Sequence, residues 1–483
     1  MTRLLALWDS LRGSFWFVPA VGLILGFALS STTIWIDRAW LEGEVESSWL
    51  RTTPEASRTI LGALTGALVT VTGLVFSLTM VVLTQTASQY GGRLLRTFMS
   101  RPLPQITLAL FLGTSIFCLR VLRDVRDADD LLFAPHLSTA LAIGLFLCCL
   151  AMFLAFIHHT ARMIQAPEII RSVADDLAEA IERIYPAGVA EPPGDAPDDL
   201  SFGEQPRATV RLREIGYLQG VDEERLIDLA RERECLVRLL VRPGLFVGSQ
   251  TAVAEILPPS AAREDVCGEL REAFILGTDR TPRQDVEAAI LELVEIAVRA
   301  LSPGINDPRT AITATHYLAD AFVRLASRHF PSEARFVDGE LRLVMPRERF
   351  DAMLAAAFGA ILHYAADFGP NIEAVLEGCQ RIAEAIETAA DPDWYGEQHV
   401  HDEPPSDLDA KRTAVLSIIE LIRHRTRSQI EGCAGDLLIG QCDELERAIR
   451  SGHARTSVGQ RDSDAMATAV QAIRRDESVA IET

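Results

Sequence analysis

The chain has 483 residues, of which 48% are hydrophobic and 23% charged, and its formal net charge is −21. This charge is divided unevenly, since residues 1–172 carry 13 Arg against 11 Asp and Glu, whereas residues 173–483 carry 33 Lys and Arg against 56 Asp and Glu. So acidic a second part lacks the clustered basic residues that hold nucleic-acid phosphates, which excludes a nucleic-acid partner. The length predicts about two to four domains.

The first apolar stretch predicts a transmembrane helix over about residues 15–36. It is longer than the apolar core of a signal peptide and continues into IWIDRAW, so we expect it to be retained. Trp16 and Trp35 are 19 residues apart. A helix covers roughly 29 Å over that distance, which allows each ring to lie at one membrane interface.

The second apolar stretch, residues 62–88, contains no charged residue. As a helix it is roughly 40 Å long, which exceeds the roughly 30 Å hydrocarbon core of a bilayer. Small residues recur along one side of this helix in steps of four and seven. They are Gly62, Gly66, Gly73, Ser77, Thr84 and Ser88, and a neighbouring edge repeats threonine every seventh residue at Thr65, Thr72, Thr79 and Thr86.

Two interpretations of this second span stay open. A face of small residues allows another helix to approach closely, and the hydroxyl groups can bond across helices or to the carbonyl four residues earlier. Alternatively, the threonine edge lines a water-filled path where copies of the protein assemble. Burial of the threonines inside one subunit, or their exposure to lipid, would leave only an anchored soluble body.

Two further spans are predicted at about residues 106–122 and 137–157, which completes a transmembrane domain of residues 1–160. An even number of spans places both termini on the same side of the membrane. The second span ends in a basic turn, where Arg93 and Arg96 would form the inner mouth of a pathway.

The side on which the termini lie is only weakly indicated by charge. Arginines in the short loops and flanks divide seven to six between the two sides. Eight cysteines without a CxxC pair indicate free thiols and a reducing compartment, and no cleavable signal precedes the long second part. We therefore expect a bacterial inner-membrane protein with cytoplasmic N- and C-termini.

The second part of the chain is predicted to be soluble, mainly helical and of the α+β class. A connecting helix and a linker rich in Pro, Gly and Asp occupy residues 161–206. Alternating apolar residues over 207–258 predict a small β-barrel or sandwich. Residues 259–450 are expected to form a mainly helical domain, and residues 451–483 a flexible tail.

The loop LSPGINDPRTA is the most distinctive one in this second part. Asp307, followed by proline at the first helical position, is a good N-cap for the next helix. A rigid corner between two helices is one interpretation. The other is that Asn306 and Asp307 contact a ligand, an ion or a neighbouring subunit beside the helix start.

Motifs for enzyme chemistry are missing from the sequence. No GxxxxGK[ST], GxGxxG, HExxH or GxSxG pattern occurs, so we expect no catalytic residue, cofactor or metal site. Residues 399–403, HVHDE, have ligand-type side chains without zinc-site spacing and are expected to form a solvated loop. His158 and His159 end the fourth span, where an interfacial position or pH sensing could explain them.

Four blocks in order, WDSLRGSFWFVPA, TGLVFSLTMVVLTQTASQYGGRLLRTFM, FIHHTARMIQ and ALSPGINDPRTAIT, resemble a family of predicted bacterial inner-membrane proteins that carry a domain of unknown function. The resemblance covers nearly the whole chain and implies four membrane helices with a large soluble C-terminal region. It implies no catalytic residues. In layout alone, the chain is also similar to bestrophin-type anion channels, which are ring-shaped homo-oligomers.

These observations favour an integral membrane protein that forms a homo-oligomeric ion channel or conductance pathway, with a cytosolic regulatory region. Its partners would be the lipid bilayer, other copies of itself and an unidentified small ion or ligand. The alternative is a membrane-anchored sensor or scaffold whose soluble region binds a ligand or protein partner. An enzyme ranks third.

Overall fold

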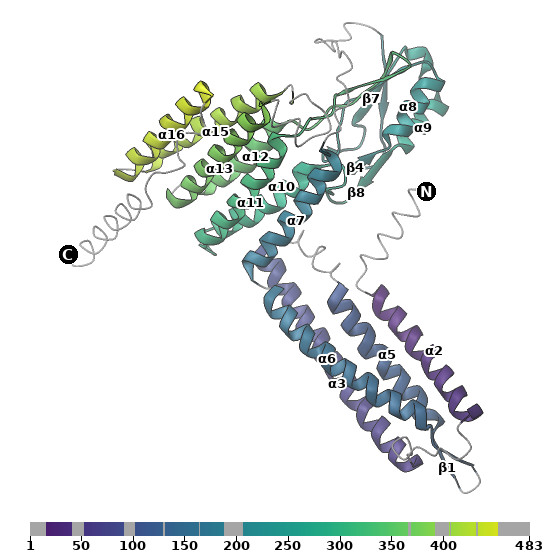
Figure 1. Cartoon of the computed structure of the whole chain (residues 1–483). Helices are drawn as coiled ribbons and strands as arrows, with labels where there is room; N and C mark the ends of the chain where they lie inside the picture. The colour runs from purple at the N-terminus through teal and green to yellow at the C-terminus, as the bar shows by residue number, and fades with distance from the viewer. Residues whose placement is uncertain are drawn as a thin grey trace, which may run out of the picture. The chain divides into compact units, whose positions relative to one another are not determined.

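The computed structural model describes residues 16–40, 53–90, 102–128, 131–163, 165–187, 206–365, 369–391, 405, 407–430 and 433–452. These form two compact units, residues 1–169 and residues 170–483, called here the membrane unit and the C-terminal unit (Figure 1). Most of the predicted linker, the basic turn with Arg93 and Arg96, residues 399–403 and nearly all of the predicted tail lie outside the described residues.

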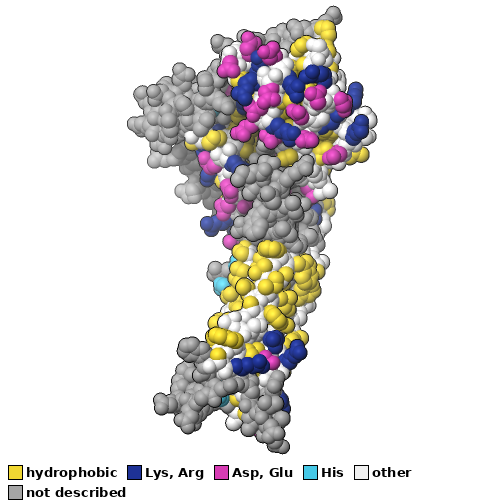
Figure 2. All heavy atoms as spheres, turned by 90° about the vertical axis from the view of Figure 1, so that its right-hand side faces the viewer, with side chains coloured by type: hydrophobic (Ala, Val, Ile, Leu, Met, Phe, Trp, Pro, Cys, Tyr) yellow, Lys and Arg dark blue, Asp and Glu magenta, His cyan; other side chains and the backbone are white. Residues whose placement is uncertain are grey.

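Four long apolar helices make up the membrane unit, which confirms the four predicted spans. They are α2 (Phe17–Trp40), α3 (Pro54–Tyr90), α5 (Pro102–Asp124) and α6 (His136–Met163). A short antiparallel pair, β1 (Arg126–Ala128) and β2 (Leu131–Phe133), joins α5 to α6. Figure 2 shows mainly hydrophobic side chains along the middle of this bundle, whereas many charged side chains are interspersed over the described part of the C-terminal unit.

Helix α5 packs against α2, α3 and α6, and it is the most buried of the four long apolar helices. Its contact with α2 depends on small residues at a spacing of four. A Cβ atom placed at Gly22 would lie 2.4 Å from the carbonyl oxygen of Ala109, and one at Gly26 would lie 2.1 Å from that of Gly113. The two backbones therefore touch directly, as small residues permit between membrane helices.

A buried carboxylate joins α2 to the start of α6. Asp37 is 1% exposed, and its oxygens accept hydrogen bonds from the backbone N–H groups of Leu137 and Ser138 at 2.9 and 3.0 Å and from the Ser138 hydroxyl at 2.6 Å. The first N–H groups of a helix have no partner within the helix. Asp37 supplies that partner from a different helix.

The C-terminal unit combines short strands with a larger set of helices. The helices are α7 (Ala166–Ile184), which contains the boundary between the units, α8 (Glu223–Glu232), η1 (Pro259–Ala261), α9 (Glu264–Glu272), α10 (Val286–Ala300), α11 (Pro308–Ala326), α12 (Phe350–Tyr364), α13 (Gly369–Ala389), α15 (Leu408–Gln429) and α16 (Cys433–Ser451). The strands are β3 (Ala208–Arg211), β4 (Gly216–Val221), β5 (Leu236–Leu239), β6 (Phe246–Val247), β7 (Ala252–Leu257), β8 (Phe274–Gly277), β9 (Ala334–Val337) and β10 (Glu340–Val344).

The strands form two small sheets over one hydrophobic core. Their orders are β3-β7-β5-β10-β9 and β6-β4-β8. Buried residues from both sheets, such as Leu218, Val237 and Val253, share the core with α8 and α9. The predicted fold class is confirmed, but the described sheets do not close, so the barrel alternative was wrong.

The sheet order explains why the barrel alternative failed. Strand β10 pairs in parallel with β5, and the hairpin that contains it comes from beyond the predicted β module. Parallel strands need a long crossover connection, so no local alternation of residues shows which distant strand will join a sheet.

The only lysine of the chain stabilises the helical part of the unit. Lys411 is 1% exposed and donates hydrogen bonds to the carbonyls of Ala326 and Arg328 at 3.2 and 2.8 Å, while pairing with Asp407 at 2.8 Å. Its ammonium group lies 5.0 Å from the ring centre of Phe330. The last carbonyl groups of a helix have no N–H partner within the helix. Lys411 donates hydrogen bonds to such carbonyls at the end of α11 and just after it.

The backbone contact between α2 and α5 predicts a strong effect of one methyl group. Gly26→Ala should destabilise the membrane unit by about 1–3 kcal/mol, because the added carbon overlaps a backbone atom. Gly144→Ala on α6 is the matched control, since a Cβ atom there meets no atom within 4 Å. Thermal unfolding in detergent measures both variants, and equal midpoints would contradict the contact.

Candidate functional site

The small-residue face of α3 is open in the membrane unit. A Cβ atom placed at Gly62, Gly66 or Gly73 would meet no atom within 4 Å, and Ser77 and Thr84 are exposed. No described helix of the same chain covers this face, in contrast to the glycines of α2. The residues are therefore available to lipid or to another subunit.

The threonine edge of α3 has a different environment. The hydroxyls of Thr65, Thr72 and Thr79 donate to the carbonyls four residues earlier, at 2.7, 2.6 and 2.7 Å. Thr79 is 2% exposed, and the other two are half-buried. These hydroxyls are satisfied within their own helix, and they face the bundle rather than the open side. The side chain of Thr86 is outside the described residues.

The predicted loop residues lie at a helix start. One Asp307 oxygen accepts from the backbone N–H of Thr310 at 3.1 Å, and the other accepts from the Thr310 hydroxyl at 2.6 Å. Asp307 is therefore the N-cap of α11. Asn306, just before it, is exposed and has a left-handed backbone with φ of 48°. Both residues belong to the C-terminal unit, whereas the other predicted site residues belong to the membrane unit.

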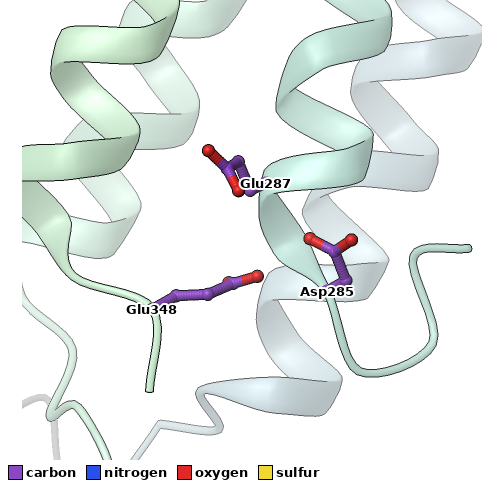
Figure 3. A group of neighbouring side chains, drawn as sticks. All are labelled: Asp285, Glu287 and Glu348. Carbon is purple, nitrogen blue, oxygen red and sulfur yellow. The ribbon is translucent and has the colours of Figure 1, made fainter. Parts of the chain in front are cut away.

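A group of carboxylates that sequence reasoning did not select lies in the C-terminal unit. Asp285, Glu287 and Glu348 point toward one another from the start of α10 and from the segment before α12 (Figure 3). Each contributes one oxygen to a set whose members lie within 4.8 Å of one another. We call these three residues, together with Arg280 and Arg242, the carboxylate cluster.

Asp285 is fully buried and fixed by two kinds of contact. Arg280 donates to both of its oxygens, from Nε at 2.8 Å and from a terminal nitrogen at 2.7 Å. The same carboxylate caps α10 by accepting from the Ala288 N–H at 3.0 Å. A two-pronged Arg–carboxylate pair fixes orientation as well as charge, so the start of α10 is held to the loop that precedes it.

The other two carboxylates share the second arginine. Arg242 contacts Glu287 at 3.1 Å and Glu348 at 3.4 Å, and Arg280 also reaches Glu287 at 2.9 Å. Tyr185, at the end of α7, donates its hydroxyl to Glu348 at 3.3 Å. The cluster thus joins α7, the β5–β6 loop, α10 and the segment before α12.

A glycine in the β5–β6 loop makes room for the cluster. Gly244 has a left-handed φ of 91°, and a Cβ atom there would lie 2.3 Å from an oxygen of Asp285. Both the backbone conformation and the lack of space require glycine at this position.

The charges of the cluster balance only if one carboxylate holds a proton. Three carboxylates face two guanidinium groups. Burial, together with the hydrogen bond to Asp285 and its charge, raises the pKa of Glu348 to about 8. Burial would also raise the pKa of Asp285, but its hydrogen bonds with Arg280 and Glu348 lower that pKa overall. Two carboxyl groups in one site commonly divide in this way, with one neutral and one ionised.

This balance disfavours a metal ion at the cluster. A divalent cation would compete for carboxylate oxygens that are already paired. Between them, the two arginines contact all three acids. A proton held between Asp285 and Glu348 balances the charges of the three acids and two arginines, and both arginines keep their contacts.

The local sequence gave one usable signal for the cluster. Asp285 directly precedes an apolar helix, which is typical of an N-cap. Arg280 and Glu287 belong to the same short segment as Asp285, but Arg242 and Glu348 come from distant segments and are 106 residues apart. No spacing rule links them.

Glu348 predicts an unusual pH dependence of stability. The unfolded chain releases this proton near its ordinary pKa of 4.5, but the folded chain keeps it up to about pH 8. The folded state therefore binds more protons in this window, and the free energy of unfolding falls as pH rises through it. Between about pH 5 and about pH 8, the free energy of unfolding of the wild type should fall by on the order of 3 kcal/mol because of Glu348. The Glu348→Gln variant should not show this contribution.

Denaturant unfolding of the full chain at several pH values measures this slope. Glu179→Gln, an exposed substitution on α7, is the control that also removes one carboxylate and should retain the wild-type slope. A Glu348→Gln variant with the wild-type slope would mean that Glu348 is ionised in the folded protein.

Comparison with known proteins gives relatives but no activity. Uncharacterized proteins of Mycobacterium tuberculosis (strains H37Rv and CDC 1551) and of Mycobacterium bovis are each 28% identical to this chain over 408 residues, covering 80% of this chain and 74% of theirs. No solved structure matches. Residues 12–377 match the family described as "Predicted membrane protein (DUF2254)". With four apolar helices and a match over most of its length, the chain belongs to this family of predicted membrane proteins.

Proposed function

We propose that this protein is a membrane-anchored sensor whose C-terminal unit responds to protons at the Asp285–Glu348 pair. The observation that carries this proposal is the position of the pair, inside a charge-balanced cluster that joins four separate segments of the unit. In this proposal the chain lies in a bacterial inner membrane with cytoplasmic termini, and the cluster meets cytoplasmic pH.

Loss of the shared proton leaves an excess negative charge in the cluster. Glu348 is only 6% exposed, so water does not stabilise that charge well. The charge can be relieved if the segment that carries Glu348 moves away from α10, or if water enters between them. Either response is a structural change driven by a single titration, as in other buried proton switches.

Hydrogen exchange of the full-length protein in lipid nanodiscs tests this response. After correction for intrinsic rates, residues 345–350 and the first turn of α10 should exchange several-fold faster at about pH 9 than at about pH 6, because the pKa of Glu348 lies between these values. Glu348→Gln should stay at the slow rate at both pH values.

Two outcomes of this experiment would contradict the sensor proposal. One is wild-type exchange that does not change with pH in these segments. The other is a pH response that Glu348→Gln shares, because the titrating group would then be a different one.

A homo-oligomeric conductance pathway is the second candidate, and the open face of α3 favours it. This face is uncharged, small and uncovered in a single chain, and α3 is 37 residues long. Thr65, Thr72 and Thr79 bond to their own helix and face the bundle, which weighs against the threonine-lined path expected from the sequence. The candidate therefore requires a different lining, made of Gly66, Gly73, Ser77 and Thr84. Neither candidate function requires a catalytic residue.

Planar-bilayer recordings of purified protein test the second candidate. Ser77→Leu should reduce unitary current, because a large side chain would enter the lining, whereas Thr72→Val should not, because Thr72 faces the bundle. The molecular mass in detergent is measured in parallel. A strict monomer, or membranes without current over a range of pH, would remove this candidate.

A further inference from the structure

A cavity with a different electrostatic character lies beside the carboxylate cluster. It has a volume of about 660 Å³ and is lined entirely by residues of the C-terminal unit. Tyr185 lines this cavity and also donates its hydroxyl to Glu348. A volume of this size is typical of sites for small molecules.

The lining of this cavity is basic in an acidic part of the chain. It contains Arg183, Arg283, Arg335 and Arg347 against one carboxylate, that of Glu223. The four arginines come from α7, the segment before α10, β9 and the segment before α12. We call this space the arginine cavity. Its excess of positive charge contrasts with the net charge of −23 carried by residues 173–483.

The guanidinium groups of three of these arginines are held in position by hydrogen bonds within the protein. Arg347 donates to both oxygens of Glu223, at 3.0 and 2.8 Å. Arg335 donates to the carbonyl of Ser332 at 2.7 Å, and Arg183 donates to that of Pro282 at 2.8 Å. A guanidinium has five N–H donors, so contacts of this kind orient it without using its full binding capacity.

Another part of the cavity wall is aromatic and apolar. The rings of Tyr185 and Phe330 lie 4.6 Å apart between centres at an interplanar angle of 38°, and Pro331 continues this wall. A ligand that fits both kinds of wall has an anionic group and an uncharged organic part.

We propose that the arginine cavity binds a small organic phosphate monoester. Phosphate suits the site better than a single carboxylate because a monoester carries close to two negative charges at neutral pH and has three acceptor oxygens. Arg347 already pairs with both oxygens of Glu223, so the phosphate oxygens are bound by the N–H donors that the cavity guanidinium groups have beyond their contacts within the protein. The organic part of the ester lies against Tyr185 and Phe330.

This binding site uses other arginines than the proton response proposed for Glu348, although Tyr185 of its lining contacts Glu348 and Arg347 precedes Glu348 in the chain. The cavity arginines do not include Arg242 or Arg280, which pair with the acids of the carboxylate cluster. A variant that abolishes the pH response is therefore expected to keep the phosphate site.

Isothermal titration of the full-length protein in detergent tests the proposal, with adenosine monophosphate as the probe and adenosine as its uncharged match. Binding of the monophosphate alone is expected, with weaker affinity as salt is raised. Arg183→Gln and Arg283→Gln should each weaken binding about tenfold or more, as expected for loss of a charge-assisted hydrogen bond. Arg231→Gln on α8, outside the cavity, should leave binding unchanged.

Further arms of the experiment identify the source of the phosphate and the outcomes that overturn the proposal. Inorganic pyrophosphate and vesicles containing phosphatidic acid are titrated alongside, so that a free phosphate is distinguished from a lipid headgroup. Failure of all three phosphate probes to bind overturns the site, as does binding that both cavity variants retain in full. At about pH 6, Glu348→Gln should bind the monophosphate with wild-type affinity, because glutamine is neutral like the protonated side chain and leaves the cavity arginines in place.

Discussion

The buried ion pair between Arg280 and Asp285 is the interaction on which the C-terminal unit depends. Asp285 is fully buried and would be costly to ionise alone, but Arg280 binds both of its oxygens and the first turn of α10 supplies an N–H donor. Because Asp285 remains charged, Glu348 beside it is driven to hold a proton. Together with burial, the Arg280–Asp285 ion pair is therefore the reason that the pKa of Glu348 is raised. The segments that carry these side chains are held together by the same set of contacts.

The membrane unit depends on a different constraint, the direct approach of two backbones. Gly22 and Gly26 allow α2 to touch α5, and α5 in turn contacts the other two long helices. The four long helices therefore pack together without any close contact at the glycines of α3. The open face of α3 is thus a property of how the chain packs, and it is available to lipid or to another subunit.

Local patterns predicted much of the fold but little of the site. Four uncharged or weakly charged apolar stretches predicted the four spans, and proline after Asp307 predicted the start of α11. The same patterns could not show that Gly22 and Gly26 have a partner helix while Gly66 and Gly73 have none among the described helices, since both pairs are spaced for close packing. Only the tertiary arrangement separates the two cases.

The carboxylate cluster and the arginine cavity were missed for a related reason. Both are built from segments that are far apart in the sequence and come together at the ends of helices and strands, where no period of two or 3.6 residues relates them. Of the cluster, only Asp285 has a recognisable local role as a helix cap. The parallel pairing of β10 with β5, which also brings the segment before α12 into the unit, has no local signal.

The central claim of this account is that Glu348 is protonated in the folded protein near neutral pH. Infrared difference spectroscopy of the full-length protein between about pH 6 and about pH 10, values on either side of its pKa of about 8, observes that proton directly. The account predicts that a protonated carboxyl band is present at the lower pH, is lost at the higher pH and is missing in Glu348→Gln. A wild-type spectrum without this band, or an identical band in the variant, would contradict it.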